Sequence, residues 1–116
     1  MSTYRQRDIV LVPFPFSDLS SAKVRPVLVL SNDSYNAHSA DILVCGITTN
    51  LSPGPYSEVL MANDVEVPGS LRHISRIKAD TIASLDQSLV IKPIARVKIP
   101  VFVRVLAHVS KLVALP

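Results

Sequence analysis

The sequence predicts a mainly β domain, a small β-barrel followed by one C-terminal helix. Short apolar runs rich in β-branched residues alternate with turn residues up to Ile99, as expected for strands joined by short connections. Nine prolines against three glycines supply most of the breaks between these runs. Beyond Pro100 the apolar residues recur at helical spacing instead. The length of 116 residues predicts a single domain over residues 1–116.

The first half of the chain is predicted to hold four strands. Residues 9–12 form an apolar, β-branched run. Pro13 predicts that this strand ends, bulges or lies at an edge, because proline has no N–H for the ladder. A mostly polar loop follows over residues 17–23, and turn chemistry at residues 32–34 closes the second run. The other strands predicted here are residues 26–30, 41–48 and 58–61.

The second half is predicted to contain shorter strands and the helix. A fragment at residues 65–67 precedes strand-like stretches around residues 73–77 and 81–84. Residues 86–88 predict a turn or a single helical turn, and residues 94–99 a last short strand. The many valines in the helix weaken its local propensity, so we expect it to depend on packing. Its apolar stripe consists of Phe102, Val105, Leu106, Val109, Leu112 and Val113.

Composition excludes several classes of protein. Hydrophobic residues make up 48% and charged residues 18% of the chain, which is the opposite of the balance in disordered proteins. The low charge indicates apolar surface available for self-association. The apolar runs are far shorter than the ~20 residues that span a bilayer, so no membrane partner is expected. Cys45 is the only cysteine, which excludes an internal disulfide and fits a cytoplasmic location.

The charge and the motifs of the sequence make one arginine the strongest candidate for a functional residue. The net charge of +3 allows an anionic partner, while phosphate-binding glycine loops, metal-binding histidine motifs and nucleophile elbows are all missing. Arg25 stands where a polar loop enters an apolar strand, just before Pro26. An arginine held rigid there offers a planar fork of donors suited to phosphate. A solvated loop arginine is the alternative interpretation.

Four stretches of the chain resemble the PemK/MazF toxins of bacterial toxin–antitoxin systems. They are residues 8–19 (DIVLVPFPFSDL), 24–33 (VRPVLVLSND), 44–49 (VCGITT) and 78–86 (KADTIASLD). The resemblance implies an SH3-like (CcdB/MazF-like) barrel with a C-terminal helix that works as a homodimer. It also implies an endoribonuclease that cuts single-stranded RNA without metal or other cofactor. A cognate antitoxin protein is the implied partner that suppresses it.

The resemblance also implies a set of catalytic residues. The arginine of the family's Arg-Pro motif matches Arg25, and the threonine that ends the third strand matches Thr48. Some members use an arginine and an aspartate two residues apart, which here are Lys78 and Asp80. In metal-free RNA cleavage the 2′-hydroxyl attacks the phosphate, which needs a base, an acid and donors to the phosphate oxygens. Charge stabilisation by Arg25, a hydrogen bond from Thr48 and a base or base-orienting role for Asp80 are expected.

The expected RNA-binding residues surround this set. Lys78 is expected to hold the RNA backbone, although a lysine lacks the bidentate geometry of the arginine that it replaces. Tyr56 is the candidate for stacking on a base. Cations at Lys23, Arg72, Arg76 and Lys92 widen the basic surface, or else form an ordinary solvated face. Two other functions stay open at this point: a non-enzymatic, CcdB-like gyrase poison, and a member that binds RNA or antitoxin without cutting.

Overall fold

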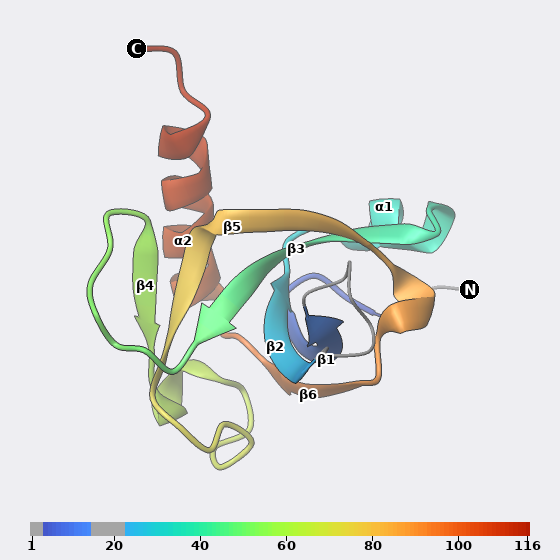
Figure 1. Cartoon of the computed structure of the whole chain (residues 1–116), viewed down its shortest axis with the longest axis horizontal. Helices are drawn as coiled ribbons and strands as arrows, with labels where there is room; N and C mark the ends of the chain where they lie inside the picture. Colours follow the sequence, from blue (N-terminus) through green and yellow to red (C-terminus); the bar gives the residue numbers. More distant parts are fainter. Residues whose placement is uncertain (1–3, 15–22) are drawn as a thin grey trace.

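A computed structural model of the chain describes residues 4–14 and 23–116 (Figure 1). Most of the polar loop predicted over residues 17–23 therefore lies outside the described residues. The strands are β1 (Asp8–Phe14), β2 (Lys23–Val29), β3 (Asp41–Thr48), β4 (Ser57–Leu60), β5 (Ser75–Asp86) and β6 (Lys92–Arg96). The helices are α1 (Asp33–His38), α2 (Ile99–Leu112) and the 3-10 turns η1 (Ala62–Asp64) and η2 (Gln87–Leu89).

The six strands of the described residues form one antiparallel sheet in the order β4-β5-β3-β2-β1-β6. The sheet curls into a half-barrel, and α2 stands against its β4–β5 end (Figure 1). The predicted mainly β fold with one C-terminal helix is confirmed. No helix of the described residues has both the length and the hydrophobicity that crossing a membrane requires.

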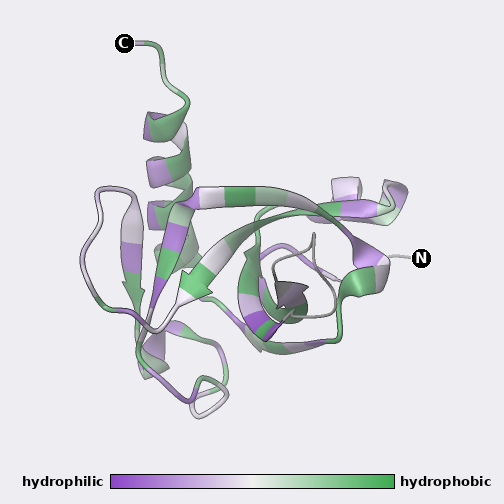
Figure 2. Cartoon of the chain, in the orientation of Figure 1, coloured by the Kyte–Doolittle hydropathy of each residue, from purple (hydrophilic) through white to green (hydrophobic). Residues whose placement is uncertain are grey.

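Both faces of the sheet carry a core, because side chains alternate along each strand. On β2, Leu28 points to the face that α2 covers, while Val27 and Val29 point to the concave face enclosed by the curl. The strands in the middle of the sheet accordingly contain many hydrophobic residues, shown in green in Figure 2. Helix α2 contributes Val101, Phe102 and Val105 to the first core. The remaining members of the predicted stripe differ: Val109 is partly buried, whereas Leu106, Leu112 and Val113 are exposed.

A large bulge joins two stretches that the sequence predicts as separate strands. Residues 75–77 and 81–84 belong to the single strand β5, whereas His73 and Ile74 of the first predicted stretch precede it. Opposite it, Cys45 of β3 faces Ile82 whereas the next residue, Gly46, faces Lys78. The residues from Ala79 to Thr81 thus have no partner on β3, and the Ala79 N–H instead donates to the Tyr56 carbonyl at 2.9 Å. The interruption in the apolar pattern marks this bulge rather than a loop.

Two further differences have local causes. Residues 32–34 begin helix α1 rather than a plain turn, because the Asn32 side chain caps the helix by accepting the Tyr35 N–H at 2.8 Å. The last strand ends at Arg96 instead of continuing through Ile99, where α2 begins. Val97 forms an isolated bridge with Val65, so the predicted fragment at residues 65–67 makes one bridge and no strand.

Pro13 lies inside β1 at the position that the ladder allows. Strand β1 continues to Phe14 and pairs with β2 as far as its end. On its other side the pairing with β6 stops at Leu11. Pro13 therefore lies where β1 has one neighbouring strand in the described part of the chain, which is the edge position expected for a proline.

A charged cluster fixes α2 to β4. The Glu58 carboxylate accepts hydrogen bonds from Arg104 Nε at 3.1 Å and His108 Nε2 at 2.8 Å. Burial alone would raise the pKa of Glu58, but these hydrogen bonds and the positive charges outweigh it, so its pKa lies below the ordinary value. The His108 ring also meets the edge of Tyr56, with centroids 6.5 Å apart. The helix is thereby linked to the loop that precedes β4.

Replacing Glu58 by glutamine should make the stability of the protein less dependent on acid. Because the folded-state pKa is lowered, the carboxylate stabilises the fold above the ordinary value of about 4.3. This contribution is lost as the pH falls through the lower folded-state pKa. At pH 7 we expect Glu58→Gln to lower the free energy of unfolding by about 1 kcal/mol, since the cluster is partly exposed to solvent. Urea unfolding between pH 7 and pH ~3 tests this, and a difference between the two proteins that does not shrink in acid would contradict it.

Candidate functional site

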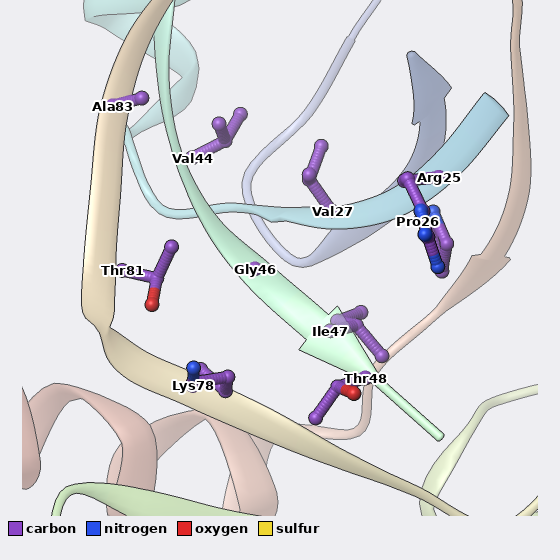
Figure 3. A pocket seen from close by; sticks show the side chains of 10 residues that line it. All are labelled: Arg25, Pro26, Val27, Val44, Gly46, Ile47, Thr48, Lys78, Thr81 and Ala83. Carbon is purple, nitrogen blue, oxygen red and sulfur yellow. The ribbon is translucent and has the colours of Figure 1, made fainter. Parts of the chain in front are cut away.

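A first hollow of about 270 Å³ opens on the concave side of the sheet, where β2 and β3 separate (Figure 3). Their pairing ends at Val27 and Gly46. Pro26, the next residue of β2, has no N–H with which to extend the ladder. A Cβ on Gly46 would lie in van der Waals contact with the Thr81 methyl, at 3.4 Å, so the glycine leaves space beside Thr81. The lining residues are Arg25, Pro26, Val27, Val44, Gly46, Ile47, Thr48, Lys78, Thr81 and Ala83.

A second hollow of about 330 Å³ adjoins the first and is built largely by the loop between β3 and β4. Thr48 and Lys78 line both hollows, so we treat the two together as the site groove. The bulge of β5 turns Asp80 toward the second hollow. The full lining is Thr48, Asn50, Ser52, Pro53, Gly54, Tyr56, Ser57, Arg76, Lys78 and Asp80.

The structure brings most of the sequence-predicted site residues to this groove. Thr48 at the end of β3 lies between Arg25 on β2 and Lys78 on β5 (Figure 3). Tyr56 and Asp80 line the second hollow. Lys23 differs from these five residues: it is exposed on β2, two residues before Arg25 and on the same face of the strand, but lines neither hollow.

The cations that line the groove form no ion pair with any carboxylate in the described part of the chain. Four arginines of the described residues form ion pairs, namely Arg5, Arg7, Arg96 and Arg104, and none of them lines the groove. Within the described residues, Arg25, Arg76 and Lys78 have no ion pair. Asp80 is the one acidic residue in the lining of the two hollows. The groove therefore presents unpaired positive charge to a ligand.

Arg76 lines the second hollow, although the sequence did not predict it as a residue of the site. The sequence suggests it only as part of a wider basic surface. Its position opposite Thr48 follows from the β3–β5 register, which joins segments far apart in the chain. Its Nε is buried and has no hydrogen-bond partner within the described structure. A buried donor without a partner is costly, which favours an anionic or polar ligand in the second hollow.

The cysteine and the three histidines of the chain do not line the groove. Cys45 is buried, and burial followed by the nearby Asp80 charge raises the pKa of its thiol to about 12, so it is no nucleophile at neutral pH. His38, His73 and His108 line neither hollow. Among the described residues no three His, Cys, Asp or Glu side chains gather as metal ligands would. The groove residues that can move or hold a proton include Asp80, Tyr56, Lys78 and Thr48.

The fold and the groove define a half-barrel domain closed by a C-terminal helix, with unpaired cations on its concave face. Residues 5–113 match the family of PemK-like, MazF-like toxins of type II toxin–antitoxin systems, and the chain belongs to this family. No curated protein shows significant similarity to the chain.

Solved structures share the fold at low sequence identity. An endoribonuclease in complex with its cognate antitoxin, from Mycobacterial species, superimposes with a TM-score of 0.79 at 18% identity over 98% of both chains. A MazE–MazF structure from Deinococcus radiodurans gives 0.78 at 22% identity, covering 97% of this chain and 98% of that one. The Mycobacterium tuberculosis toxin MazF-mt6 gives 0.74 at 17% identity, covering 90% and 94%. At these identities the likeness shows that the fold is common to all of them.

Proposed function

We propose that this protein is the toxin of a type II toxin–antitoxin system and a metal-independent endoribonuclease that cuts single-stranded RNA at specific sequences. The observation that carries the proposal is the pair of Arg25 and Thr48 on either side of the opening between β2 and β3, where Arg25 forms no ion pair with any described carboxylate. A phosphodiester in this opening would meet guanidinium and hydroxyl donors together. The family and the endoribonucleases that share the fold support the same activity.

The chemistry follows from what each group can donate or accept. The 2′-hydroxyl attacks the adjacent phosphate and expels the 5′-oxygen, which leaves a 2′,3′-cyclic phosphate and a 5′-hydroxyl. Arg25 and Thr48 stabilise the charge that develops on the phosphate oxygens. Asp80 is the base, or orients the base, and Lys78 holds the RNA backbone between the two hollows. Tyr56 stacks on a base in the second hollow, where Arg76 supplies a further donor.

Two protein partners belong to the proposal. Some of the solved neighbours are complexes with an antitoxin, and an acidic antitoxin is suited to cover a groove of unpaired cations. A second copy of the chain is the other partner, because the outer face of α2 is apolar and exposed. In a twofold dimer this face would join the protomers and place two Arg25 sites in one assembly. We place the complex in the cytoplasm, where mRNA is available. The exposed apolar residues of this face are Ile99, Val103 and Leu106, followed by Val113 just past the end of the helix.

Incubating the purified protein with a long single-stranded RNA in excess EDTA tests the proposed function. We expect discrete fragments that end in a 2′,3′-cyclic phosphate, because the groove supplies its own charge stabilisation. End-group analysis by mass spectrometry and mapping of the cut sites measure the result. RNA that stays intact with folded protein would contradict the proposal. The remaining interpretations would be that the protein acts on a protein target, such as a topoisomerase, or that it binds RNA without cutting it.

A further inference from the structure

A third hollow of about 680 Å³ lies beyond the site groove, between the β1–β6 strands and the segment that precedes β5. Pro26 and Ile47 line both the first and the third hollow. Thr48 faces the site groove while the next residue, Thr49, faces the third hollow. The two regions therefore meet at the place where β2 and β3 separate.

The charge of the third hollow resembles that of the site groove. Arg72, His73 and Lys92 line it, and no aspartate or glutamate does. All three are exposed, and in the described part of the chain Arg72 and Lys92 have no ion pair. The hollow therefore complements an anionic ligand.

The shape and lining indicate what kind of anion fits. The floor is aliphatic, with Ile9, Leu11 and Ile94, and carries no aromatic ring. A base can lie on such a floor but gains less there than by stacking on an aromatic ring. The volume lies within the range of small-molecule sites. Cations at the rim above an apolar floor favour a charged, flexible strand that is held mainly through its phosphates.

We propose that the third hollow is an accessory site for single-stranded RNA, which binds the phosphates of nucleotides that flank the cut. The strand leaves the site groove across Pro26 and Ile47, and Arg72 and Lys92 contact its backbone. This proposal rests on the proposed function and adds a length dependence to it. Strands long enough to reach the third hollow bind more tightly than those confined to the groove. The added contacts do not read sequence.

The test compares two double variants that remove the same charge. Arg72→Ala/Lys92→Ala removes the two cationic side chains at the rim of the third hollow. Lys98→Ala/Lys111→Ala removes two exposed cations that line none of the three hollows. Binding is measured by fluorescence anisotropy with 2′-deoxy single strands, which cannot be cleaved through a 2′-hydroxyl. Lengths of about 6 and about 20 nucleotides lie near the lower end and above the upper end of the ~4–16 nucleotides that one single-strand-binding OB fold covers. Thermal melting checks that each variant is folded.

We expect the Arg72→Ala/Lys92→Ala variant to bind the long strand about tenfold more weakly at moderate salt. The slope of log Kd against log salt should fall by about 1.4, since each phosphate contact on a single strand contributes about 0.7. The advantage of the long strand over the short one should shrink in this variant and persist in the Lys98→Ala/Lys111→Ala control.

Several results would overturn the accessory site. One is a slope that is unchanged in the Arg72→Ala/Lys92→Ala variant, and another is an equal loss in the control variant. A variant that loses antitoxin binding but keeps the wild-type salt slope would show a protein-binding surface instead. The assay measures binding alone, so the two proposals can fail separately. Cleavage in EDTA with an unchanged slope removes only the accessory site, and a lowered slope without cleavage removes only the endoribonuclease.

Discussion

Replacing Arg25 by alanine should reduce RNA cleavage by about 100-fold or more, the usual loss when a preorganised charge-stabilising donor is removed. Its side chain is exposed at the rim of the first hollow and forms no ion pair within the described structure. Its loss should therefore cost the fold little. Initial rates on a fluorescent RNA measure the effect, and the melting temperature of the variant should stay near that of the wild type.

Two further substitutions separate charge from geometry at this site. Arg25→Lys keeps the positive charge but loses the planar fork of donors, so we expect it to recover only a small part of the lost rate. Thr48→Val removes the hydroxyl at nearly constant volume and should slow cleavage as well. The matched control is Lys98→Ala, which removes an exposed cation that lines neither hollow of the groove. Unfolded Arg25→Ala protein would mean that Arg25 is structural, and full activity would mean that the reaction takes place elsewhere.

Much of the fold could be predicted from local pattern. β-Branched runs such as residues 41–48 coincide with strands because one strand's alternation depends only on its own residues. The C-terminal helix was predictable for the same reason. Its inner and outer faces were not distinguished, since Phe102 and Leu106 are both apolar and only the position of the sheet decides which one is buried. Helix α1 was missed because six residues carry little periodicity and its cap competes with an ordinary turn.

The arrangement of the site residues could be predicted only in part from the local sequence pattern. Arg25 could be singled out from its position before Pro26, and the family resemblance added Thr48 and Lys78. The distribution of these residues over adjoining hollows depends on the β3–β5 register and its bulge, which involve segments about thirty residues apart. No sequence pattern placed Arg76 opposite Thr48. Likewise, the separation of β2 and β3 that links the third hollow to the groove is a property of the pairing and not of either strand.

Replacing Phe102 by alanine should cause the largest loss of stability. Phe102 is 4% exposed and belongs to the core between α2 and the sheet. Removing a buried phenylalanine ring typically costs about 3–5 kcal/mol, because the cavity closes only in part. Domains of this size are stable by about 5–15 kcal/mol, so the variant should lose a large share of its stability. Urea unfolding at neutral pH, with the midpoint and slope both recorded, measures the change.

The expected size of this effect depends on how α2 is held in place. The helix is rich in valine, whose propensity for helix is low, and it adds Val101 and Val105 to the same core as Phe102. Packing therefore has to hold it, with the Glu58 cluster as a weaker second link. Ser110→Ala, on an exposed position of the same helix, should change the free energy of unfolding by less than about 0.5 kcal/mol. A Phe102→Ala protein as stable as this control would mean that α2 does not depend on its packing against the sheet.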